Sequence, residues 1–79
     1  MNIPENILID AYTYLMNNKT GYQNDLNKIH PMLVSYLIKE GTIGVGIDAN
    51  AQLRYHVTKS GEHIVNIQYR ALLLKSIDE

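Results

Sequence analysis

Residues 53–65 read Leu-Arg-Tyr-His-Val-Thr-Lys-Ser-Gly-Glu-His-Ile-Val, and this stretch carries two structural patterns in succession. Leu53, Tyr55 and Val57 alternate with polar residues, which predicts a short strand with one apolar face. Thr58 is a residue type that caps helix N-termini, and apolar residues follow it at helical spacing. The stretch therefore predicts a strand that leads directly into a capped amphipathic helix.

A helix and a second strand are predicted just before this stretch. Residues 31–40 place apolar side chains on one face at the helical period, with Pro31 as the first helical residue. Gly41 is a residue type that ends helices. Apolar residues then alternate with glycines over 43–47, and Asp-Ala-Asn-Ala at 48–51 is typical of a turn. The predicted order is helix, hairpin and capped helix.

The N-terminal third of the chain is also predicted to be helical. A helix from Pro4 to Met16 carries an apolar stripe with a four-residue repeat, and the segment 17–21 ends it. Residues 22–29 allow two interpretations: a short second helix, or the opening turns of one longer helix that Pro31 kinks. We favour the short helix.

The last predicted helix has apolar residues on two sides, so it needs two surfaces to pack against. One stripe consists of Ile64, Ile67, Ala71 and Leu74. A second and broader stripe consists of Val65, Tyr69, Leu72 and Leu73. We assign one side to the domain core and predict that Val65, Tyr69, Leu72 and Leu73 form the interface of a homodimer.

Length and composition bound the class of protein. The 79 residues predict one α+β domain spanning 1–79, and the chain contains no Cys, which removes disulfides and thiolate zinc sites. The N-terminus lacks the pattern of a signal peptide, and no apolar run has the length of a membrane span, so we expect a cytoplasmic protein. The three His lack metal-ligand spacing, and neither a phosphate-binding glycine loop nor a catalytic constellation is recognisable. We therefore expect no enzymatic activity, metal or cofactor.

Two motifs resemble the winged-helix core of bacterial regulators of the PadR and MarR types. They are Ser-Tyr-Leu-Ile-Lys-Glu-Gly-Thr-Ile at 35–43 and Tyr-His-Val-Thr-Lys-Ser-Gly at 55–61, and Gly21-Tyr22 is similar to the Gly-Tyr that opens the second helix of PadR-like proteins. The resemblance implies a small winged helix-turn-helix, with three helices, a two-stranded wing hairpin and a long C-terminal helix. It also implies a transcriptional regulator that binds double-stranded DNA. The chain departs from the pattern in a shorter segment after Gly21 and in a wing whose only Arg is Arg54.

In such a fold the third helix would enter the major groove and the wing would contact the backbone or the minor groove. The residues predicted to bind DNA are Asn24, Asn27, Lys28, Ser35, Lys39, Arg54, His56 and Lys59. Asn pairs well with adenine, and Lys with guanine or phosphate. The same residues could equally form an ordinary solvated polar surface.

The charge balance supports an alternative function. Seven Lys and Arg stand against eight Asp and Glu, a formal net charge of −1, whereas most small DNA-binding domains are basic. The alternative is a winged helix that contacts protein only, as an adaptor or inhibitor from a phage or mobile element. Cations gathered on one surface would favour DNA, and cations interleaved with acids would favour protein. The cations concerned are Lys28, Lys39, Arg54 and Lys59, and the acids are Asp25, Glu40 and Asp48.

Overall fold

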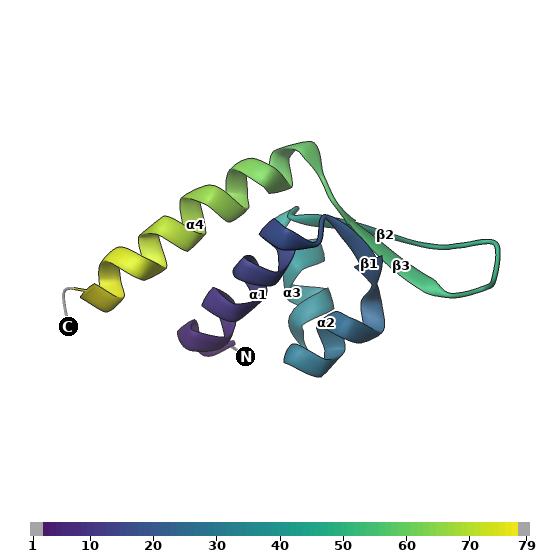
Figure 1. Cartoon of the computed structure of the whole chain (residues 1–79), viewed down its shortest axis with the longest axis horizontal. Helices are drawn as coiled ribbons and strands as arrows, with labels where there is room; N and C mark the ends of the chain where they lie inside the picture. Colours follow the sequence, from purple (N-terminus) through teal and green to yellow (C-terminus); the bar gives the residue numbers. More distant parts are fainter. Residues whose placement is uncertain (1–2, 78–79) are drawn as a thin grey trace.

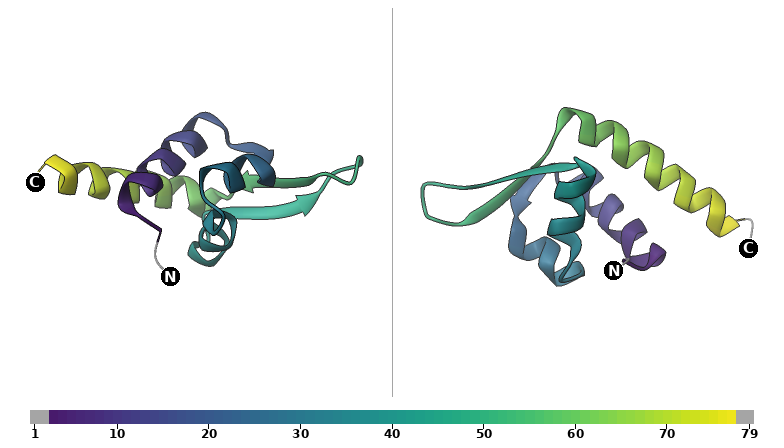
Figure 2. Two further views of the ribbon diagram at one scale, coloured as in Figure 1. Left: turned by 90° about the horizontal axis from the view of Figure 1, so that it is seen from below. Right: turned by 180° about the vertical axis from the view of Figure 1, so that it is seen from behind.

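The computed structural model describes residues 3–77 and has an α+β fold in which helices pack against a three-stranded antiparallel sheet (Figure 1). The elements in chain order are α1 (Glu5–Asn17), β1 (Thr20–Tyr22), α2 (Gln23–Ile29), α3 (Leu33–Glu40), β2 (Ile43–Ile47), β3 (Leu53–Val57) and α4 (Lys59–Ile77). The β2–β3 hairpin projects away from the helices, and α4 runs beside α1 toward the other end of the molecule (Figures 1 and 2). The hairpin and α4 extend toward opposite ends of the molecule (Figure 1), whose principal extents are 46 × 24 × 20 Å.

The predicted hairpin is confirmed. Strands β2 and β3 pair antiparallel from Ile43 opposite Val57 to Ile47 opposite Leu53. In the turn, the Asp48 carboxylate accepts hydrogen bonds from the backbone N–H groups of Asn50 and Gln52, and the Asp48 N–H donates to the Gln52 carbonyl. An Asx-type turn of this kind is the role that Asp commonly fills between two strands.

A third strand was not predicted, because residues 17–21 were expected to be only a helix end. Strand β1 instead pairs with β3, with Thr20 opposite His56 and Tyr22 opposite Arg54, and the sheet order is β1-β3-β2. Three residues are too short to show an alternating pattern of their own. The strand exists because the chain after α1 lies against the outer edge of β3, where the Lys19 carbonyl accepts a hydrogen bond from the Val57 N–H.

The short-helix interpretation of residues 22–29 is confirmed, but the predicted start of the next helix is wrong. Helix α3 begins at Leu33 rather than at Pro31. A turn separates α2 from α3: the His30 Nδ1 accepts a hydrogen bond from the Met32 N–H, and the His30 carbonyl accepts one from the Leu33 N–H. The first helix is confirmed, although it runs from Glu5 to Asn17 and each end is displaced by one residue from the prediction. It begins at Glu5 because Pro4 serves as its N-cap.

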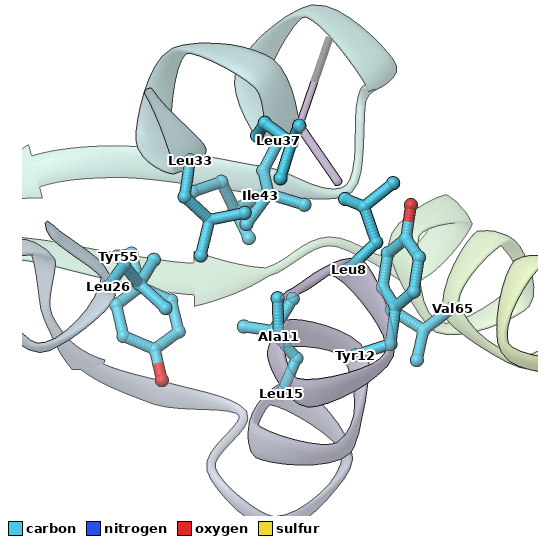
Figure 3. Close-up of a cluster of buried hydrophobic side chains, with 11 residues drawn as sticks. Leu8, Ala11, Tyr12, Leu15, Leu26, Leu33, Leu37, Ile43, Tyr55 and Val65 are labelled. Carbon is cyan, nitrogen blue, oxygen red and sulfur yellow. The ribbon is translucent and has the colours of Figure 1, made fainter. Parts of the chain in front are cut away.

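The core forms where α1, α3, the base of the sheet and α4 meet (Figure 3). Helix α1 contributes four buried side chains, those of Leu8, Ala11, Tyr12 and Leu15. The other buried apolar side chains are Ile3, Leu26, Leu33, Leu37, Ile43, Tyr55 and Val65. The apolar face of the hairpin therefore enters the core only at its base, and its outer half extends beyond the helices.

The junction between β3 and α4 is anchored to the end of α3. Thr58 caps α4 as predicted, because its Oγ1 accepts a hydrogen bond from the Gly61 N–H at 2.8 Å. The same hydroxyl donates to the Gly41 carbonyl at 2.8 Å, and the Thr58 N–H donates to the Thr42 carbonyl. Gly41 has the left-handed conformation, φ +86°, that suits its predicted role after α3. Gly61 is so close to the preceding chain that a Cβ there would lie 2.0 Å from the Thr42 carbonyl oxygen.

The orientation predicted for α4 is wrong. Val65, predicted to lie at a dimer interface, is only 3% exposed and belongs to the core, and Tyr69 and Leu72 pack partly against that core. The exposed side of α4 instead carries Ile67 and Leu74, which are 62% and 63% exposed. The anchored Thr58 junction sets this rotation, since it aims the second stripe at α1. Leu73, 36% exposed, lies at the margin between the two sides.

Candidate nucleic-acid interface

A shallow groove separates the start of α2 from the outer half of the hairpin. It is lined by Tyr22, Gln23, Asn24, Asp25, Asn27, Ala51, Gln52 and Leu53. Two of the residues predicted to bind DNA, Asn24 and Asn27, are exposed on this wall of α2. The Gln23 Nε2 donates a hydrogen bond to the Arg54 carbonyl at 2.9 Å, which ties α2 to β3 and fixes the floor of the groove. Amide side chains of Asn and Gln offer both donors and acceptors to a base edge.

Arg54 is held in place by two neighbours. Its guanidinium lies over the ring of Tyr22, 4.3 Å from the ring centroid, and its Nη1 is 3.9 Å from Oδ2 of Asp48. Antiparallel pairing of β1 with β3 places Tyr22 directly opposite Arg54, so the contact follows from the register of the sheet. Stacking on an aromatic ring positions the guanidinium, and the nearby carboxylate reduces its positive potential.

His56 shares its face of the sheet with Arg54, as predicted, because the two residues are two positions apart on β3. Their partners on β2 are Gly44 and Gly46, which have no side chains. The imidazole of His56 fills this space over the neighbouring strand: a Cβ built at residue 44 would lie 2.5 Å from the ring. The polar face of the hairpin is therefore shallow, with only the β3 side chains standing above it.

The solvent side of α3 carries few charges. Ser35 and Lys39 are exposed there, and Lys39 forms no ion pair within residues 3–77. Met32, the N-cap of α3, and Ile38 on the helix itself are each 43% exposed. A helix of this composition could meet base edges through Ser35 and Lys39, and it also offers apolar area to a partner surface.

Glu40, the last residue of α3, forms a polar contact between α1 and the α3–β2 connection. Both of its carboxylate oxygens accept a hydrogen bond from the Tyr12 hydroxyl at 2.9 Å, and Oε1 accepts a second one from Oγ1 of the buried Thr42 at 2.6 Å. Burial, together with the adjacent Glu40 carboxylate, raises the pKa of Tyr12 far above its ordinary value. Glu40 is thus a structural acid, and within residues 3–77 it forms no ion pair with Lys39, the cation of α3.

The predicted DNA-binding residues do not form one uniformly basic surface. Lys28 lies 3.9 Å from the carboxylate of Asp25, and Arg54 lies at the same distance from Asp48. Lys59 is exposed at the start of α4, where it lines a different hollow with Glu62 and His63. The cations are therefore interleaved with acids at two of the four positions, and Lys39 and Lys59 form no ion pair in the described part of the chain.

Sequence reasoning missed three polar residues of the groove, Tyr22, Gln23 and Gln52. Their position depends on β1 and on the tip of the hairpin approaching α2, and neither contact leaves a local pattern. The only feature of the sequence that indicated any of these three residues was the position of Tyr22 just before a helical segment.

Comparison with family models, with curated proteins and with solved structures finds no match to this chain. Among residues 3–77 no three His, Asp or Glu side chains come close enough together to hold a metal ion. None of the helices in the same range combines the length and the apolarity needed to cross a membrane.

Proposed function

We propose that this chain is a winged helix-turn-helix domain that binds duplex DNA. The observation that carries the proposal is the order α1-β1-α2-α3-β2-β3-α4, combined with the sheet order β1-β3-β2 and a hairpin that projects beside α2 and α3. In such an arrangement α2 and α3 form the helix-turn-helix, and the β2–β3 hairpin is the wing. Control of transcription in the cytoplasm is the process that this function would serve.

Each part of the surface would have a separate role in the complex. Ser35 and Lys39 on α3 would face the major groove, and Asn24 and Asn27 offer amides that suit adenine edges. Arg54 and the cations at positions 28, 39 and 59 would contact phosphates, which supplies affinity without sequence preference. His56 lies on the wing face next to Arg54, where a phosphate or the minor groove could be reached.

A second candidate function is the contact of this winged helix with another protein. The observation that favours it is the pairing of Lys28 with Asp25 and of Arg54 with Asp48, which lowers the positive potential of the proposed DNA surface. The net charge of −1 and the exposed apolar side chains of Met32 and Ile38 also favour contact with a protein. Electrostatic attraction to phosphate is the largest source of non-specific DNA affinity. A weak positive potential on the proposed DNA surface therefore favours a protein partner over DNA.

Titration of the isotope-labelled protein with mixed-sequence duplex DNA, followed by amide NMR shifts at low salt, tests the proposal. We expect shifts in α2, α3 and the hairpin that disappear when salt is added. The variant Lys39→Ala should lower the salt dependence of binding by roughly 0.9 in the logarithmic slope, the value for one lost phosphate contact.

Lys75→Ala is the matched control, because Lys75 forms an ion pair with Glu5 on α1, away from the proposed surface. It should bind DNA like the unaltered protein. Equal losses of affinity in Lys39→Ala and Lys75→Ala would reject the proposed contact surface. A spectrum unchanged at about millimolar DNA, a concentration above ordinary non-specific dissociation constants, would reject DNA binding and favour the protein-contact function.

A further inference from the structure

We infer that the free edge of β2 is a self-association surface, at which two copies of this chain join β2 to β2 in antiparallel orientation about a two-fold axis through Val45. The sheet order β1-β3-β2 leaves β2 paired with β3 on one side only. Joining the two edges would make one continuous six-stranded sheet, with three strands from each copy. The inference does not rest on DNA binding, because α2, α3 and the polar face of β3 stay outside the joint.

The hydrogen bonds at the two ends of the hairpin show which backbone groups of β2 are free. The Thr58 N–H donates to the Thr42 carbonyl, and the Asp48 N–H donates to the Gln52 carbonyl. In an antiparallel pair every second residue bonds to the partner strand, so the glycines at 44 and 46 bond to β3. The N–H and C=O groups of Ile43, Val45 and Ile47 therefore point to the open edge. No loop, turn or side-chain hydrogen bond within residues 3–77 reaches these groups.

This edge lacks the features by which proteins ordinarily prevent strand addition. The sequence of 43–47 is Ile-Gly-Val-Gly-Ile, without a charge, a Pro or a bulge. Val45 and Ile47 are 44% and 69% exposed, and Leu53, opposite Ile47 on β3, is 55% exposed. The other edge of the sheet, β1, is only three residues long, which is itself a form of protection. The unprotected edge is thus confined to β2.

The symmetry of the strand identifies a second copy as the occupant. Ile-Gly-Val-Gly-Ile reads the same in both directions, so antiparallel pairing about Val45 sets Ile43 opposite Ile47, glycine opposite glycine, and Val45 opposite itself. All apolar side chains then lie on the face that carries Ile43 into the core, where cross-strand pairs stabilise a sheet. Ile47, the most exposed of them, would lie beside the buried Ile43 of the other copy. Because the strand is uncharged, two copies meet without charge repulsion at the joint.

Oxidative cross-linking of a single-cysteine variant tests the geometry, since the chain has no Cys of its own. In Val45→Cys the two thiols would face each other across the axis. Facing residues of a hydrogen-bonded pair have Cα atoms about 5.5 Å apart, within the range of a disulfide. We expect mild oxidation to produce a covalent dimer in high yield. Ile67→Cys on the exposed side of α4 is the control and should form no covalent dimer. Equal or greater cross-linking of Ile67→Cys would overturn the inference.

Mass measured by light scattering over a concentration series tests the same surface without oxidation. The unaltered chain should approach twice the monomer mass at high concentration, and Val45→Lys should stay monomeric, because an edge Lys opposes strand pairing. Ile67→Lys should associate like the unaltered chain. A monomer at every concentration, or a dimer that Ile67→Lys abolishes and Val45→Lys preserves, would place the inference in error. Thermal unfolding of each variant verifies that it is folded. If Val45→Lys is unfolded, the cross-linking of Val45→Cys decides whether two copies join through β2.

Discussion

Replacement of Gly61 by alanine should destabilise the protein, although alanine is the better helix former. Gly61 is the third residue of α4, where alanine alone would gain about 1 kcal/mol over glycine. The added methyl group would lie 2.0 Å from the Thr42 carbonyl oxygen and 2.8 Å from its carbonyl carbon, both backbone atoms. Helix α4 and the α3–β2 connection must therefore separate.

The cost of this separation can be worked from the bonds that it breaks. Moving α4 stretches the Thr58 N–H bond to the Thr42 carbonyl and the Thr58 hydroxyl bond to the Gly41 carbonyl, and each such bond contributes about 1 kcal/mol. Loss of the cap costs about 1 kcal/mol more. When the gain of about 1 kcal/mol from the helix propensity of alanine is subtracted, the net loss of unfolding free energy is about 2 kcal/mol. For a domain of this size it corresponds to a melting temperature lower by roughly 8–16 °C.

Gly46→Ala is the matched control for the Gly61 experiment. Nothing lies within 4 Å of the position its Cβ would take, so the added methyl meets no neighbour. Alanine within a strand is favoured over glycine by about 0.5–1 kcal/mol, and the control should be equal to or more stable than the unaltered protein. Urea and thermal unfolding followed by circular dichroism measure both variants. Equal stabilities of the two alanine variants would refute the close approach of α4 to Thr42.

Three further perturbations follow from the core and its polar contacts. Tyr12→Phe removes the hydroxyl that donates to the carboxylate of Glu40 and should lower the unfolding free energy by about 2 kcal/mol in urea titrations; an unchanged midpoint would show that this bond contributes nothing. Burial raises the pKa of Tyr55 from 10.0 to about 12, so the folded state holds its proton more tightly; the resulting stability is fully present below pH 10.0 and is lost as pH rises through about 12. Melting temperatures across this range should fall less steeply in Tyr55→Phe, and parallel curves would contradict the shift. Val65→Ala should lower the unfolding free energy measured in urea by about 2 kcal/mol, and Ile67→Ala by less than about 0.5 kcal/mol, because only the Val65 side chain is buried. A larger loss in Ile67→Ala would show that α4 turns the opposite side toward the core.

Much of the fold was predictable because its signals are local. The apolar stripe of α1, the alternation along β3 and the cap at Thr58 each depend on residues close in sequence, and all three are present in the structure. The start of α3 was misjudged for a local reason too. His30 uses its side chain and its carbonyl to form a turn, and this competes with helix formation at Pro31.

The candidate site could be predicted only residue by residue. Asn24, Lys39 and Arg54 are on the surface, as expected of polar residues on amphipathic elements. That Arg54 stacks on Tyr22 could not be foreseen, because the contact exists only through the pairing of β1 with β3. The sequence also did not decide whether acids and cations interleave on this surface, because net charge contains no information on where the charges lie.

Local sequence thus set the helices, the hairpin and the capped junction, because periodicity and capping act over a few residues. The third strand, the rotation of α4 and the free edge of β2 came from contacts between segments far apart in the chain. Val65 shows the difference most clearly: its stripe is as apolar as that of Ile67, and composition alone does not rank them. The anchoring of Thr58 on Gly41 and Thr42 aims one stripe at α1 and leaves the other in solvent. Burial is a property of the assembled neighbours, and it is therefore decided only when the elements pack.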